Sequence, residues 1–151
     1  MPDLGINPHF SLARFLASLR SLEMATDPDY SASTVAPTRL VSEPQSANVT
    51  PATLQLTLDW RNIPTEGPAE IVSKLTDLLE QSLESGCQGQ VEVVTKELAT
   101  YTGYQMTYPD TFPSFTTEPE NPWLTEAQRN LAVALDREVQ VGTWRFATDG
   151  G

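Results

Sequence analysis

The sequence is poor in the residues that build most reaction centres. It has one cysteine, Cys87, and one histidine, His9, among 151 residues. No disulfide can form within the chain, and zinc usually takes three or four ligands from histidine, cysteine and carboxylates. A serine-type triad would need His9, and nothing around it resembles a nucleophile elbow. We therefore identify no catalytic residue and no metal site in the sequence.

Basic residues and long apolar runs are also scarce. Nine Lys and Arg against twenty Asp and Glu give a net charge of −11, whereas binding to nucleic acid relies on many basic side chains. Apolar runs long enough to cross a bilayer are missing. Residues 1–5 lack the basic start and apolar stretch of a secretory signal. We expect no nucleic-acid or membrane partner and a cytoplasmic location.

Two segments have the apolar spacing of amphipathic helices. Residues 7–23 begin with an N-cap at Asn7 and a proline at Pro8, and residues 68–84 begin at Pro68. Their apolar faces consist of Leu12, Phe15, Leu16, Leu19 and Leu22, and of Ile71, Leu75, Leu78 and Leu79.

Strands are predicted at residues 38–42, 53–61 and 91–98, with residues 24–37 as a loop. The second strand alternates cleanly, and its inward residues are Leu54, Leu56, Leu58 and Trp60. The order α-β-β-α-β predicts an α+β fold, a ferredoxin-like two-layer sandwich that has the pattern β-α-β-β-α-β but lacks its first strand.

Composition changes after residue 100. Residues 101–122 are rich in Pro, Thr, Tyr and Phe and predict an extended connection. A third helix is expected at 125–136, capped by Thr125, and a further strand at 138–146. A Gly-rich turn directly after a buried-looking strand is an unusual place for a natural C-terminus, so we expect Gly151 to be a truncation point.

Three short segments occur in a definite order. They are Met1-Pro2-Asp3-Leu4-Gly5-Ile6-Asn7, then Ala47-Asn48-Val49-Thr50-Pro51 with Asp59-Trp60-Arg61 after seven residues, and finally Trp144-Arg145-Phe146-Ala147-Thr148-Asp149-Gly150. They resemble the motifs H-A-S-x-P-x-x-G-x-N-A, N-V-I-P … D-x-R and T-D-G of one metallopeptidase and deacylase family. Its members include succinyl-diaminopimelate desuccinylase, acetylornithine deacetylase and carboxypeptidase G.

The resemblance implies a domain organisation and an activity. The family has an α/β catalytic domain with two metal ions and a smaller ferredoxin-like lid domain that mediates homodimerisation. Residues 1–99 are then the dimerisation (lid) domain without its first strand, and residues 100–151 are a connection and the truncated start of the C-terminal part of the catalytic domain. The full-length enzyme would use two zinc (or cobalt or manganese) ions to hydrolyse an amide bond of an N-acyl amino acid or small peptide. The metal ligands and the general-base Glu lie outside this stretch, so the fragment is expected to bind no cofactor and to be inactive alone.

The resemblance also names site residues, each with a structural alternative. Arg61 would grip the substrate carboxylate, or it pairs with Asp59 on the surface. Asn48 would contact substrate across the dimer, or it forms a turn. Thr148, Asp149 and Gly150 would lie against the substrate carboxylate, or they form a tight turn. Asn48 and Arg61 are expected on neighbouring strands that face one cleft.

The remaining candidates are interpreted as structural. His9 stands where the family usually has a small apolar residue and is taken as an ordinary helix residue, and Cys87 as an inert turn residue. The loop carboxylates Asp110, Glu118 and Glu120 are taken as solvated surface. The alternative function is a free-standing ferredoxin-like module that dimerises or binds a small ligand without catalysis.

Overall fold

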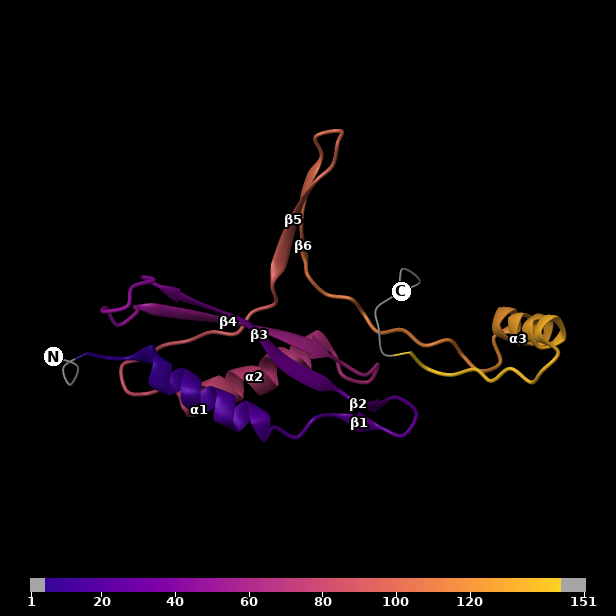
Figure 1. Ribbon diagram of the computed structural model, residues 1–151, viewed down its shortest axis with the longest axis horizontal. Coiled ribbons are helices and arrows are strands. Elements are labelled where there is room, and N and C mark those ends of the chain that lie inside the picture. Colours follow the sequence, from indigo (N-terminus) through magenta and orange to yellow (C-terminus); the bar gives the residue numbers. More distant parts are fainter. Residues whose placement is uncertain (1–4, 145–151) are drawn as a thin grey trace.

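The computed structural model describes residues 5–144, and its centre is a long antiparallel hairpin covered by two helices. Strand β3 (Thr34–Glu43) pairs with β4 (Thr53–Arg61), with Thr34 opposite Arg61 and Glu43 opposite Thr53. Helices α1 (Pro8–Arg20) and α2 (Pro68–Ser82) pack against each other and lie on one face of this hairpin (Figure 1). These two layers form the α+β architecture expected from the sequence.

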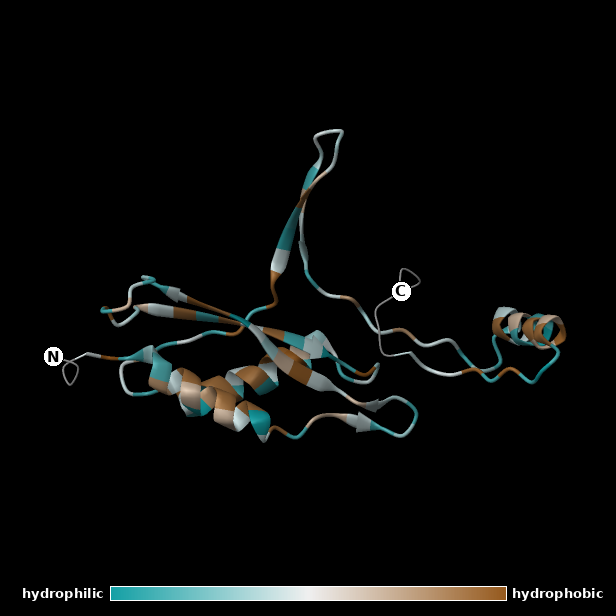
Figure 2. Ribbon diagram, in the orientation of Figure 1, coloured by the Kyte–Doolittle hydropathy of each residue, from teal (hydrophilic) through white to brown (hydrophobic). Residues whose placement is uncertain are grey.

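The core lies between these two layers. Phe15 and Leu19 of α1 and Leu75 of α2 are buried there, each less than a tenth exposed. Of the four inward residues predicted for β4, Leu56, Leu58 and Trp60 pack against them, whereas Leu54 is not part of this cluster. The other half-buried apolar residues of the cluster are Leu16, Leu22, Val35, Ile71, Leu78, Leu79 and Val91. Figure 2 shows the corresponding apolar stretches on the two helices beneath the hairpin.

The ends of both helices follow from local sequence. The side chain of Asn7 accepts a hydrogen bond from the backbone N–H of His9 at 3.1 Å, which confirms the predicted N-cap of α1. Pro68 occupies the first turn of α2, where the lack of an N–H has no consequence. Each helix ends two or three residues earlier than the periodicity alone suggested, at Arg20 and Ser82.

The segment predicted as a loop at 24–37 has more regular structure than expected. Strands β1 (Thr26–Asp27) and β2 (Ser31–Ala32) form a small hairpin, and β3 already begins at Thr34. The register of β3 shifts between Pro37 and Arg39. A bulge at that point lets a residue without an N–H remain inside a strand, so Pro37 does not interrupt β3.

The strand predicted at 91–98 does not join the β3–β4 sheet. Residues 91–94 have no strand pairing in the structure, and β5 (Thr95–Ala99) instead pairs with β6 (Gln105–Pro109) in a hairpin that projects from the body (Figure 1). In a split βαβ unit a third strand lies between the two strands that the helix connects. Residues 5–144 place no strand there, so β5 pairs with its neighbour in sequence. Strand β6 also interrupts the connection predicted at 101–122.

Helix α3 (Pro122–Leu135) stands apart from the other described elements (Figure 1). Asn121, and not Thr125 as predicted, caps it by accepting hydrogen bonds from the N–H groups of Trp123 and Leu124. Trp123 is 83% exposed and Val133 is 80% exposed. The strand predicted at 138–146 is absent from its described part, residues 138–144. Within residues 5–144, no helix is long and apolar enough to span a membrane.

Candidate functional site

Arg61 is the last residue of β4, on the face of the hairpin that points away from the helices. Strand alternation puts its neighbour Trp60 on the core side and Arg61 on the outer side. Its Nε atom lies 3.2 Å from Oδ2 of Asp59, and both side chains are about half exposed. This ion pair is the surface contact considered as the structural alternative. The role of Arg61 in holding a substrate carboxylate stays a prediction.

Asn48 lies in the loop that joins β3 to β4. Its Oδ1 atom accepts a hydrogen bond from the Ser46 hydroxyl at 2.8 Å, so its side chain makes a local contact of the kind expected for a turn residue. The loop and the start of α1 together line a hollow of about 460 Å³, which includes Asn7, His9 and Asn48. A contact between Asn48 and substrate stays a prediction.

Asn48 and Arg61 lie at opposite ends of the same hairpin. The β3–β4 loop begins beyond the pair Glu43–Thr53, whereas Arg61 pairs with Thr34 at the far end. Eight residue steps along β4 separate the two ends by roughly 26 Å at about 3.3 Å per residue. The expectation that Asn48 and Arg61 lie on neighbouring strands that face one cleft is therefore wrong.

The other sequence candidates have ordinary surroundings or lie outside the described part. Thr148, Asp149 and Gly150 are outside residues 5–144. His9 is in the first turn of α1, where its Nδ1 atom lies 2.9 Å from Oδ1 of Asn7. Cys87 is a half-buried free thiol in the turn that follows α2.

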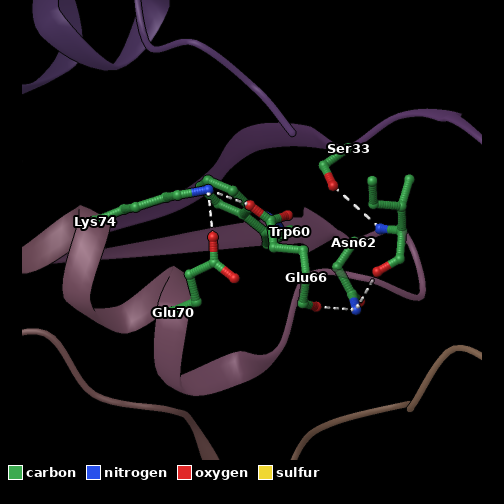
Figure 3. Close-up of polar contacts among 7 residues, drawn as sticks. Ser33, Trp60, Asn62, Glu66, Glu70 and Lys74 are labelled. Carbon is green, nitrogen blue, oxygen red and sulfur yellow. Dashed lines mark hydrogen bonds and ion pairs between the residues drawn. The ribbon is translucent and has the colours of Figure 1, made fainter. Parts of the chain in front are cut away.

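A buried carboxylate, that of Glu66, lies in the loop between β4 and α2 and bonds to Trp60, the residue before Arg61 (Figure 3). The side chain of Glu66 is 1% exposed. Its Oε2 atom accepts a hydrogen bond from the indole Nε1 of Trp60 at 3.0 Å, and its Oε1 atom lies 2.8 Å from Nζ of Lys74. Lys74 also pairs with Glu70 at 3.1 Å, so a half-exposed ammonium bridges two carboxylates.

The environment of Glu66 favours its charged form. Burial raises the pKa of the carboxyl, but hydrogen bonds from Lys74, Ser33 and Trp60 lower it, and the net result is a pKa below the ordinary value of 4.5. Hydrogen bonds to Glu66 and Glu70 raise the pKa of Lys74 in turn. Both partners therefore remain charged through the neutral range, as a buried ion pair requires.

One hydrogen bond links this loop to the second half of the chain. The side-chain amide of Asn62 donates to the carbonyl oxygen of Glu66 at 2.8 Å and to Oγ of Ser114 at 3.3 Å. Ser114 belongs to the extended segment between β6 and α3. The loop that follows Arg61 thus contacts both the helical layer and the connection.

Residues 1–87 match the peptidase dimerisation domain. The chain belongs to this family. The matched region contains α1, both strands of the central hairpin and α2, together with Asn48, Arg61 and Glu66. No curated protein matches the chain.

Membership of the peptidase dimerisation domain family confirms the broad resemblance found in the sequence. Such domains are typical of metal-dependent peptidases and form homodimers. Among the described residues, no three His, Cys, Asp or Glu side chains are grouped so that they could hold a metal ion. The described residues thus do not fit a metal centre, and we assign no catalytic step to them.

Sequence reasoning missed Glu66, the most buried charged residue described. It lies in a Pro64-Thr65-Glu66-Gly67-Pro68 turn, a composition that indicates solvated loop. The pair Glu70–Lys74 has helical i,i+4 spacing and was a readable signal. The contact between Glu66 and Lys74 spans the start of α2, and no spacing rule predicts it.

Proposed function

We propose that this chain supplies the dimerisation and substrate-binding part of a metal-dependent amidohydrolase that acts on an N-acyl amino acid or small peptide. The match of residues 1–87 to the peptidase dimerisation domain carries the proposal. The order of the N-V-T-P and D-W-R segments supports a kinship with the desuccinylase, deacetylase and carboxypeptidase G group. The metal ions and the general base belong to protein outside residues 5–144.

Arg61 is the proposed anchor for the substrate carboxylate. A guanidinium group matches a carboxylate through two parallel N–H···O hydrogen bonds. Asp59 contacts the Nε edge of Arg61, which restricts the guanidinium plane on the outer face of the hairpin. The helices cover the other face, so this outer face is the one that can approach a second domain (Figure 1).

Asn48 is the proposed second contact, contributed by the partner subunit. Roughly 26 Å of strand separates Asn48 from Arg61 in one chain, which is too far for both to hold one small substrate. A two-fold dimer places equivalent surfaces of two chains against each other. Arg61 of one subunit and Asn48 of the other would then complete one site, and each dimer would have two such sites.

The exposed surface supports assembly with further protein. The chain has 12050 Å² of accessible surface, whereas a compact monomer of this mass is expected to have about 7,600 Å². In the described structure β3 and β4 pair only with each other, so each has one open edge. We propose a homodimer through residues 1–99, with residues 100–151, including Thr148, Asp149 and Gly150 near the substrate carboxylate, belonging to the catalytic part.

Titration of the chain with N-acetylglycine, followed by NMR, tests the role of Arg61. Arg61→Ala is expected to weaken binding at least about tenfold, which corresponds to ~1.4 kcal/mol. Arg39→Ala is the matched control, because Arg39 pairs with Thr57 on the same outer face of the hairpin. Equal binding by wild type and Arg61→Ala would refute the carboxylate role.

Mixing two defective variants tests whether one site uses two chains. Arg61→Ala and Asn48→Ala are each expected to lose binding, and re-associated mixtures are expected to regain about one intact site in four. Mixtures that stay as defective as the separate variants would contradict a shared site. Sedimentation of the wild type provides the assembly state, and a strictly monomeric chain would contradict the homodimer.

Metal analysis tests the proposal that the metal ions are bound by other parts of the enzyme and not by this chain. The purified chain is expected to retain well below one zinc ion per molecule. About two tightly bound ions per chain, the complement of a two-metal site, would show that the catalytic centre is here.

A further inference from the structure

Side-chain hydrogen bonds surround the buried Glu66 in the β4–α2 loop. Glu66 accepts hydrogen bonds from Trp60 and Lys74, and the hydroxyl of Ser33 lowers the pKa of its carboxyl. That hydroxyl oxygen in turn accepts a hydrogen bond from the backbone N–H of Ile63 at 3.1 Å. Ser33 is itself 1% exposed. A buried carboxylate without hydrogen-bond donors would destabilise the folded chain. The donors around Glu66 are therefore needed together to keep its charge buried.

Both residues that flank Arg61 are held by this network (Figure 3). On one side, the indole N–H of Trp60 is bonded to the Glu66 carboxylate. On the other side, the amide of Asn62 donates to the carbonyl oxygens of Glu66 and Ile63, at 2.8 Å and 3.2 Å. A rotation of the backbone at Arg61 would break hydrogen bonds on both sides.

We infer that Glu66 is a positioning residue for Arg61: it fixes the direction in which the guanidinium leaves β4, and so sets the affinity of the site for a carboxylate. This inference rests on the proposed role of Arg61 in substrate binding. A long arginine side chain loses conformational entropy when it binds a ligand. If the backbone at the end of β4 is already fixed before binding, less entropy is lost. Trp60 and Asn62 hold the backbone on either side of Arg61, and neither residue has to touch the substrate.

A purely structural role for Glu66 makes a different prediction. It would lower stability on substitution and leave the surroundings of Arg61 unchanged in the folded chain. Ser11→Ala is the matched control for a loss of stability that does not involve Arg61. Ser11 is 5% exposed and accepts a hydrogen bond from the N–H of Glu84 at 2.9 Å. Glu84 follows α2, and Glu66 precedes it, so the 15-residue helix separates the two contacts by roughly 22 Å at 1.5 Å per residue.

The first measurement needs no ligand. The Nε–Hε NMR signal of Arg61, assigned by its loss in Arg61→Lys, is compared in wild type, Glu66→Gln, Trp60→Phe and Ser11→Ala. We expect the signal to shift or broaden in Glu66→Gln and Trp60→Phe and to stay in place in Ser11→Ala. Trp60→Phe removes the indole N–H and part of the ring system but keeps an aromatic ring in the core, so it replaces Glu66→Gln in the test if that variant fails to fold. An unchanged signal in the folded variants would overturn the inference.

The second measurement is the affinity for N-acetylglycine. We expect Glu66→Gln and Trp60→Phe to bind about tenfold more weakly, and the double variant no more weakly than either single variant, because both act through one contact. Ser11→Ala should bind as the wild type does. If the wild type binds and the variants bind equally well, the positioning role is wrong. If the wild type does not bind but the Arg61 signal moves in Glu66→Gln, the carboxylate role of Arg61 fails and its mechanical coupling to Glu66 stands.

Discussion

The ammonium group of Lys74 lies 2.8 Å from the buried carboxylate of Glu66, and the two charges join α2 to the loop that precedes it. Glu66 is 1% exposed and the side chain of Lys74 is 31% exposed. The pair thus combines a carboxylate without access to water and a cation that keeps part of its hydration.

Acid is expected to destabilise the chain through Glu66. Its folded-state pKa is lowered below 4.5, so the stabilisation is fully present above the unfolded-state pKa and is lost as the pH falls through the folded value. The raised pKa of Lys74 keeps that partner charged to above pH 10.5. The difference in free energy of unfolding between wild type and Glu66→Gln, measured by denaturant titration, should be constant between pH 6 and pH 9. It should shrink below about pH 4.5, and a difference that grows with acid would contradict the assignment.

Removal of the Glu66 carboxylate is expected to be costly at neutral pH. Glu66→Ala leaves the indole N–H of Trp60 without its acceptor and the ammonium of Lys74 with Glu70 alone, which should lower the free energy of unfolding by about 3 kcal/mol. The control is Arg129→Ala, which breaks the exposed pair with Glu126 on α3 and should cost less than about 0.5 kcal/mol. Similar losses for the two variants would show that the Glu66 network adds little.

Core packing is expected to be confined to the α1–α2 layer and the central hairpin. Leu75→Ala truncates a side chain that is 6% exposed and should cost about 3 kcal/mol. Leu131→Ala truncates a side chain on α3 that is 49% exposed and should change stability by less than about 0.5 kcal/mol. Denaturant titration followed by circular dichroism measures both. A large loss for Leu131→Ala would indicate that α3 packs against other protein, as it would in a dimer or with a catalytic domain.

Hydrogen exchange should divide the chain at the end of α2. Amides of α1, β4 and α2 are expected to exchange slowly because they surround the core cluster. Amides of α3 should exchange quickly in the monomer, because a 14-residue helix that packs on no other described helix or strand is marginal in water. Slow exchange in α3 that depends on protein concentration would show that assembly covers it.

Local chemistry made much of the dimerisation unit predictable. The N-cap at Asn7, the proline at the start of α2 and the alternation of β4 each depend on residues close together in sequence. The prediction of α3 was less accurate, because Thr125 and Asn121 are both acceptable caps and sequence alone gave no basis for choosing Asn121. The candidate site was even harder to predict from the sequence. Arg61 and its pair with Asp59 were readable from alternation, whereas Glu66 was not.

The sequence by itself determined the two helices and the central strand β4 in the first 87 residues, because helix caps and apolar periodicity act over a few residues. It did not reveal the β1–β2 hairpin or the early start of β3. Tertiary structure decided the rest: that β5 pairs with β6, that Asn48 and Arg61 lie at opposite ends of one hairpin, and that Glu66 is buried against Trp60 and Lys74. Strand pairing and the burial of a charge depend on contacts between residues that are far apart in the sequence. Only the folded structure shows which of these contacts form.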